Sequence, residues 1–233
     1  MSELSNIKVT SPEYDDVIPS TGNSVKLTPF RVGDEKALLI AQQSGNNKQM
    51  ANTLRSIISK NVVPVNVADI APYDIEYLFL KLRAISVGET SKIGVKCKNC
   101  DESNEIDVDL NEIDVKKDEN HKNFVKIDEK LGFEMKYADL DDMMKVDGEN
   151  LESIVEMIAA SVKTVYFNED TINVGKAEQK DLIGILNDLT TTQFTKIQEY
   201  FETMPKVRKD ITFTCKSCGT ENHQVLEGLA SFF

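Results

Sequence analysis

The stretch Asp74–Cys100, DIEYLFLKLRAISVGETSKIGVKCKNC, joins an apolar helix to a hydrophobic strand that ends in two cysteines. Its helical half follows Pro72, a residue typical of helix starts, and runs to Gly88. Apolar residues recur there at helical spacing: Ile75, Leu78, Phe79, Leu82 and Ile85. This nearly continuous apolar face predicts a helix at the centre of the core, with a groove for a partner as the alternative.

Two cysteine pairs share one spacing. Cys97 and Cys100 form a C-x2-C motif, Cys215 and Cys218 form a second, and the chain has four cysteines in all. Aligning the pairs also aligns residues of the same kind around them: Ile93 with Ile211, Val95 with Phe213, Lys98 with Lys216 and Asn104 with Asn222. We therefore expect two copies of one unit, in which a cysteine turn joins two short strands.

The four thiolates suit a single metal ion. Two tight turns of this spacing complete a tetrahedral site of four sulfurs, which favours Zn²⁺. We predict that all four cysteines are ligands of a structural zinc ion, because a four-cysteine site leaves no open position for catalysis. Residues 91–110 and 210–227 would then form a discontinuous zinc-ribbon-like element that clamps the two ends of a helical domain.

Other uses of the cysteines remain open at this point. Disulfides require an oxidising compartment, and the N-terminal sequence MSELSNIKVTSPEYDD lacks the basic region and apolar core of a secretory signal. A redox pair would lie at the start of a helix, whereas both pairs lie between runs typical of strands. Free cysteines without a metal are a further alternative, as is His223 in place of one thiolate.

Composition limits the partners. The 233 residues carry a net charge of −12, which disfavours binding to a phosphate backbone, so we expect no nucleic-acid partner. No apolar run reaches the length of a bilayer, so we expect no membrane span. The acidic residues between Asp101 and Glu119 alternate with Ile106, Val108 and Leu110, which places them on the exposed face of a strand.

The rest of the chain predicts an α+β fold, as a mainly helical domain with short β-hairpins. Residues 1–28 contain prolines and isolated apolar positions, and we expect an extended N-terminal arm with one strand from Ser24. Residues 29–233 are expected to form a single domain. Its further elements are helices from Asp34, over 48–59, 151–165 and 180–189, and after a cap at Thr191 or Thr192, with a hairpin over 124–137.

The end of the chain and the search for catalytic motifs both indicate protein contacts. The segment Gly228–Phe233 is an apolar hook, which either folds onto the core or anchors another subunit. The sequence has no phosphate-binding loop, dinucleotide fingerprint, H-E-x-x-H or G-x-S-x-G motif, and the histidines His121 and His223 lie in polar surroundings. We therefore predict that the protein is not an enzyme.

Three segments together resemble a known family. They are Ile18–Ala41, IPSTGNSVKLTPFRVGDEKALLIA, then Asp74–Glu89, DIEYLFLKLRAISVGE, and then the V-x-C-x-x-C motif that ends at Cys100. In this order they are similar to the T4-type baseplate proteins of contractile-tailed myoviruses, a family that includes baseplate hub subunits and hub assembly proteins. The resemblance covers most of the chain and brings no catalytic residues.

The resemblance implies a late viral protein that helps to build the baseplate hub through protein contacts. The expected partners are other hub or tail proteins, with the tape-measure protein as a candidate. The expected location is the host cytoplasm during assembly and the tail baseplate of the virion if the protein is retained. A transient assembly chaperone is the alternative. A nucleic-acid-binding zinc ribbon and a thiol oxidoreductase are alternatives from other functional classes.

Overall fold

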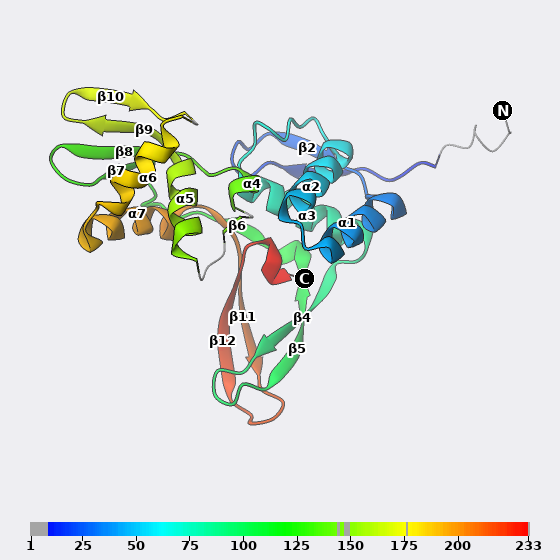
Figure 1. Cartoon of the computed structure of the whole chain (residues 1–233). Coiled ribbons are helices and arrows are strands. Elements are labelled where there is room, and N and C mark those ends of the chain that lie inside the picture. The colour runs from blue at the N-terminus through cyan, green and yellow to red at the C-terminus, as the bar shows by residue number, and fades with distance from the viewer. Residues whose placement is uncertain (1–8, 144, 147–149, 176, 233) are drawn as a thin grey trace, which may run out of the picture.

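The computed structural model describes residues 9–143, 145–146, 150–175 and 177–232, which include seven α-helices and twelve strands. They form two lobes and a projecting stem (Figure 1). The first lobe contains β1 (Tyr14–Val17), β2 (Ser24–Leu27), α1 (Val32–Ser44), α2 (Asn47–Asn61), β3 (Val62–Val63) and α3 (Pro72–Ser86). All strand pairs in the four small sheets are antiparallel.

Helix α3 lies at the centre of the core, as its apolar face predicts. Leu78, Phe79, Leu80 and Leu82 are all fully buried. Asp74 in its first turn is also fully buried, and its carboxylate accepts hydrogen bonds from the Ala71 and Ser20 amides, each at 2.9 Å. The bond to Ala71 satisfies an amide at the helix start, and the bond to Ser20 fixes the N-terminal segment against α3.

The predicted strand from Ser24 is present as β2, but the N-terminal segment forms more structure than the extended arm expected over residues 1–28. From Tyr14 on, it forms the β1–β2 hairpin, and β2 also pairs with β3. Ile18, Val25 and Leu27 are at most 4% exposed and belong to the core. Exposed and buried residues alternate along β2, which is enough to bury one face of the hairpin. This part of the arm therefore belongs to the lobe. Residues 1–8 lie outside the described chain.

The second lobe is a four-stranded sheet with helices packed on it (Figure 1). Its strands lie in the order β10-β9-β8-β7. Apolar residues of the sheet and of the helices form a second core cluster, centred on Phe133, Ile158 and Ile197. The elements are β7 (Phe124–Lys126), β8 (Leu131–Met135), α5 (Leu151–Ala160), β9 (Val162–Phe167), β10 (Asp170–Asn173), α6 (Gln179–Asn187) and α7 (Thr191–Thr203). Helix α4 (Leu140–Met143) lies at the junction of the lobes, since Leu140 belongs to the core of the first lobe.

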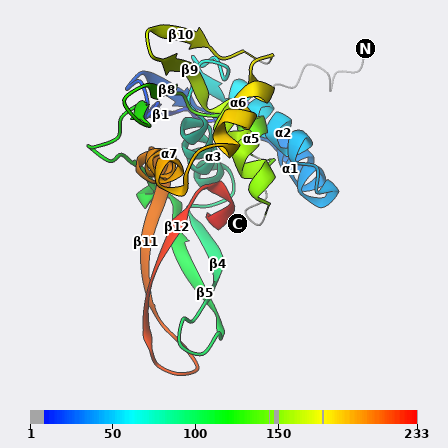
Figure 2. The same cartoon turned by 60° about the vertical axis from the view of Figure 1, so that its left-hand side comes forward.

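The stem consists of two long hairpins that lie side by side in both views (Figures 1 and 2). One is β4 (Thr90–Lys96) with β5 (Ser103–Asp109), and the other is β11 (Lys206–Thr214) with β12 (Glu221–Glu227). Near the lobes, β6 (Asp114–Lys116) pairs with the start of β11. The stem buries apolar residues that continue the core of the first lobe: Ile93, Val95, Val108, Ile211, Phe213 and Leu226.

The described part of the chain also contains the short 3₁₀ helices η2 (Leu110–Glu112) and η3 (Leu229–Phe232). In η3, Phe232 is fully buried and its carbonyl accepts a hydrogen bond of 3.1 Å from the Ser91 hydroxyl. The apolar hook was expected either to fold onto the core or to anchor another subunit, and its described part folds onto the core. Phe233 is outside the described residues.

The predicted α+β class is correct at the coarse level, but the description as mainly helical is not confirmed, because the strands form four sheets and most of the stem. The hairpin over 124–137 and the helices from Asp34, 48–59 and 180–189 occur close to their expected positions. The predicted helix over 151–165 ends at Ala160, and the last helix is capped by Thr190 rather than by Thr191 or Thr192.

Candidate metal centre

The four cysteines meet at the far end of the stem. Cys97 and Cys100 lie in the turn between β4 and β5, and Cys215 and Cys218 lie in the turn between β11 and β12 (Figure 1). Their sulfur atoms all lie within 4.8 Å of one another. The distances from Cys97 to Cys218 and from Cys100 to Cys215 are both 3.7 Å.

This sulfur spacing fits a tetrahedral metal site. Four thiolates at a Zn–S distance of ~2.3 Å lie about 3.8 Å from one another, close to the two cross-hairpin distances. Cys97 and Cys215 are almost fully buried, whereas Cys100 and Cys218 are exposed. An ion bound by four sulfurs is typically Zn²⁺ or iron. Such a site stabilises the fold and leaves no open coordination position for a substrate.

The two cysteine turns have the same backbone shape. In the first, the Cys97 amide donates to the Glu102 carbonyl and the Asp101 amide to the Cys97 carbonyl, both at 2.9 Å. In the second, the Cys215 amide donates to Thr220 at 2.9 Å and the Gly219 amide to Cys215 at 3.0 Å. The residue after each pair, Asp101 or Gly219, has a positive φ, of 57° and 71°. This left-handed position suits glycine and, among other residues, aspartate.

Two asparagines join the turns across the stem. The side-chain oxygen of Asn222 accepts a hydrogen bond from the backbone amide of Lys98 in the first turn. The side-chain oxygen of Asn104 accepts one from the backbone amide of Lys216 in the second, and both bonds measure 2.9 Å. Asn104 and Asn222 are 5% and 2% exposed. The two turns are thus related by an approximate two-fold exchange, in which each asparagine holds the opposite turn.

The amide nitrogens of the same asparagines face sulfur. The Asn222 nitrogen lies 3.4 Å from Cys97 Sγ, and the Asn104 nitrogen lies 3.7 Å from Cys215 Sγ. A donor in this position stabilises a thiolate and orients a metal ligand. The sequence alignment of the two units had paired these asparagines, but their role depends on the contact between the units and was missed.

The thiols of the cluster differ in acidity. The pKa of Cys218 is lowered to about 5, chiefly by its hydrogen bond with the Thr220 hydroxyl, at 3.2 Å. At Cys100, the Glu102 amide favours the thiolate, but hydrogen bonding with Cys218 and the other sulfurs outweighs it and raises the pKa to about 12. The pKa of Cys215 is also lowered, chiefly by hydrogen bonding with the Cys218 amide, so Cys215 and Cys218 both ionise more readily than a free cysteine.

The histidines lie apart from the cysteine cluster. His223 is not among the residues that approach one another around the sulfurs; its Nδ1 lies 3.0 Å from the Thr212 hydroxyl. His121 lies in the second lobe, where its ring packs against Tyr137 and Tyr200 and its Nδ1 lies 3.0 Å from the Thr203 hydroxyl. Burial lowers the pKa of His121.

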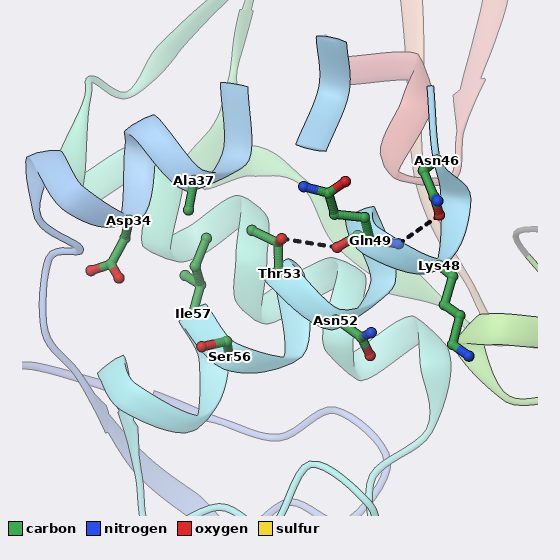
Figure 3. A pocket seen from close by; sticks show the side chains of 9 residues that line it. All are labelled: Asp34, Ala37, Asn46, Lys48, Gln49, Asn52, Thr53, Ser56 and Ile57. Carbon is green, nitrogen blue, oxygen red and sulfur yellow. Dashed lines mark hydrogen bonds between the residues drawn. The ribbon is translucent and has the colours of Figure 1, made fainter. Parts of the chain in front are cut away.

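A hollow of about 430 Å³ lies between α1 and α2 (Figure 3). Its polar groups mostly serve the helices. The Gln49 amide donates to the Asn46 side chain at 3.0 Å, which caps α2, and the Thr53 hydroxyl donates to the Gln49 carbonyl at 2.9 Å. Asp34 at the edge accepts from Lys60 at 2.5 Å.

Within the described residues, no helix is both long and apolar enough to cross a membrane.

One family model matches the chain. It is described as T4 bacteriophage base plate protein, and the match extends over residues 11–233. No curated protein and no solved structure matches the chain. The matched residues include both lobes, the stem and all four cysteines.

Proposed function

The chain belongs to the T4 bacteriophage base plate protein family, and from this premise we propose that it is a non-catalytic protein of the baseplate hub that acts by binding other tail proteins. The resemblance of Ile18–Ala41 and Asp74–Glu89 to this family is thereby confirmed. Membership gives the protein a structural or assembly role in the phage baseplate. The near-complete match over residues 11–233 is the observation that carries the proposal.

The cysteine cluster serves this role as a structural centre. In our proposal, Cys97, Cys100, Cys215 and Cys218 hold a zinc ion, and the two hairpins with their cysteine turns form a zinc-ribbon-like element. The support is the sulfur spacing of 3.7 Å across the hairpins and the matching hydrogen bonds of the two turns. When bound, the ion supplies a cross-link and no substrate chemistry. The stem then becomes a stiff projection that other proteins can contact.

The partners in this proposal are other hub or tail proteins, with the tape-measure protein as a candidate. The net charge of −12 disfavours a nucleic-acid partner, which argues against a nucleic-acid-binding zinc ribbon. In a phage infection, the protein would act in the host cytoplasm and then either stay in the virion baseplate or leave before maturation. The second case corresponds to a transient assembly chaperone.

The test follows the protein through assembly. The full chain, with an affinity tag, replaces the wild-type protein in infected cells, and mass spectrometry measures its amount in assembly intermediates and in mature particles. We expect a stable complex with at least one hub or tail protein. Retention in mature particles in a fixed ratio supports a hub subunit, and loss from mature particles supports a chaperone. Absence from every tail intermediate contradicts both forms of the proposal.

Native mass spectrometry of the purified protein tests the metal centre separately. We expect one zinc ion per chain, which leaves after treatment with a strong chelator. A chain that binds no zinc when purified from zinc-supplemented cells would contradict the structural zinc while leaving the baseplate role intact.

A further inference from the structure

Two apolar hollows meet at Glu76 on α3. The first, of about 490 Å³, lies between α1, α2 and η3, and its lining includes Leu38, Met50, Phe79 and Leu229. The second, of about 260 Å³, lies at the junction of α3 with the second lobe, and its lining includes Met157, Phe201 and Met204. Glu76 lines both hollows. Leu229 and Ala230 of η3, which lies where the stem joins the lobes (Figures 1 and 2), line the first of them.

Glu76 is a largely buried carboxylate in these apolar surroundings. Burial raises its pKa, the Leu229 amide lowers it through a hydrogen bond, and the nearby Glu227 carboxylate raises it further. Among the described residues that line the two hollows, Lys206 is the only cation, and it forms an ion pair with Glu227 at 2.8 Å. The described lining thus carries one more negative than positive charge, and a cation from elsewhere would lower the cost of keeping Glu76 ionised.

The second hollow is lined in part by aromatic residues and methionines. Tyr200 and Phe201, whose ring centroids lie 5.1 Å apart, line it from α7. Met143, Met157 and Met204 line the same hollow, and the flexible methionine side chain adapts well to the shape of a bound partner.

We propose that the two hollows together bind one segment of another baseplate protein, in which a lysine or arginine lies between apolar side chains. The apolar side chains would enter the hollows on either side of Glu76, and the cation would pair with the Glu76 carboxylate. We call this surface, defined by the residues that line the two hollows, the Glu76 groove. The inference rests on the proposed function, because it takes the partner from the same assembly.

The charges of the lining residues favour a bound segment that carries a cation. Among the described residues, Glu76 is the only ionisable one that lines the first hollow, whose other lining residues are apolar apart from Gly45, Gln42, Asn46 and Asn47. In the second hollow Lys206 and Glu227 form an ion pair, which leaves Glu76 as the negative charge without a cation. An apolar segment without a cation would leave that carboxylate buried and unpaired, which is strongly unfavourable. By contrast, the hollow between α1 and α2 is lined largely by polar residues such as Asn52 and Ser56 (Figure 3).

Site-specific photo-crosslinking tests the location of the partner. A photoreactive phenylalanine analogue replaces Met50 in the first hollow or Met204 in the second, in full-length protein expressed during infection. Mass spectrometry then identifies the cross-linked peptides. We expect both positions to capture one other baseplate protein, at neighbouring sites with a lysine or arginine between them. The same analogue at Asn52, in the hollow of Figure 3, serves as the control and should not capture this segment.

Three results of this experiment would overturn the inference. They are cross-links to a second copy of this chain, cross-links from the two positions to unrelated segments, and no cross-link from either position although the labelled protein enters the baseplate. If the labelled protein and the wild-type protein both fail to enter any tail intermediate, the proposed function itself fails. The outcomes therefore separate the groove from the baseplate role.

Charge reversal tests the predicted ion pair. We expect Glu76→Lys to weaken the complex with the captured partner by roughly tenfold or more, and reversal of the partner's basic residue to glutamate to restore binding. Glu76→Gln keeps an oxygen for the Leu229 amide and serves as the folding control: its binding should weaken although it is at least as stable as the wild type. Unchanged affinity in Glu76→Lys would contradict the inference, as would loss of binding that the partner's reversal does not restore.

Discussion

Asn104 follows the first cysteine turn and binds the second, whereas Asn222 follows the second turn and binds the first. The side-chain oxygen of Asn104 accepts from the Lys216 amide, and that of Asn222 accepts from the Lys98 amide, both at 2.9 Å. Both side chains are buried, which partly shields these bonds from water. The turns are therefore held in register by the protein itself, and the four sulfurs are brought to a spacing that suits a metal ion.

Removal of either asparagine is expected to weaken the centre. In Asn104→Ala or Asn222→Ala, a backbone amide in the opposite turn loses its acceptor in a partly buried hydrogen bond, which costs ~0.5–1.5 kcal/mol in the free energy of unfolding. Loss of a group that orients a ligand typically lowers metal affinity ~10–100-fold. Competition with a chromophoric chelator measures the zinc affinity of each variant. Asn52→Ala, on the exposed side of α2, is the matched control, and equal zinc affinity in all three variants would contradict the role of the asparagines.

The two cysteine pairs are expected to contribute equally to stability. Cys97→Ser and Cys215→Ser each remove one buried sulfur, and metal-binding energy in such a site is also folding energy. We expect both variants to lose zinc and to unfold at a lower temperature, with similar shifts in Tm. Calorimetry with zinc and with a chelator measures the effect. A Tm for Cys215→Ser that equals the wild-type value in the presence of zinc would contradict a structural metal.

Glu76 is expected to make stability depend on pH. Burial raises its pKa above the ordinary value of 4.5, so the folded state binds its proton more tightly than the unfolded state. The resulting stability is fully present below the ordinary pKa and is lost as the pH rises through the folded-state pKa. Glu76→Gln mimics the protonated side chain, so we expect it to be more stable than the wild type at pH 8, with a difference that shrinks toward pH 5.

Urea unfolding of both proteins at each pH measures this difference. The exposed Glu156→Gln is the control and should show the same stability relative to wild type at both pH values. A Glu76→Gln variant that is less stable than the wild type at pH 8 would show that the carboxylate is stabilised in the folded state, contrary to the argument from burial.

Phe232 is expected to anchor the end of the described chain. Its side chain is fully buried, so Phe232→Ala should cost ~3–5 kcal/mol in the free energy of unfolding through lost apolar contacts and a cavity. Phe167→Ala is the matched control, because Phe167 is 47% exposed and should cost much less. Chemical denaturation compares the two variants. Equal losses would mean that η3 contributes little to the core.

Sequence patterns predicted the parts of the fold that depend on local spacing. The apolar period of residues 74–85 gave α3 and its burial, and the alignment of the two cysteine pairs gave both hairpins of the stem. Neither inference needed to know which segments are neighbours in space. The cysteine cluster could also be predicted, because four cysteines in two identical motifs have few other uses.

The remainder depended on contacts between distant segments. The β1–β2 hairpin is too short to stand out from a polar, proline-containing segment, and it is held by its pairing with β3 and by Asp74 binding Ser20. The division of the core into two clusters is also invisible in the sequence, since apolar spacing shows which residues are buried but not which of them share a core. The same holds for the asparagine bonds and for the grouping around Glu76.

The position of the stem also has a consequence for chain entropy. A metal ion at its tip would close a loop that contains residues 101–214, including the whole second lobe. In the chain-entropy model, a cross-link over a loop of about 100 residues stabilises the folded state by ~4.7 kcal/mol, because it restricts the unfolded chain. Such a contact has a high sequence separation, and contacts of this kind form late when local structure forms first. Metal binding at the tip would therefore report that the segment between the two hairpins has reached its native arrangement.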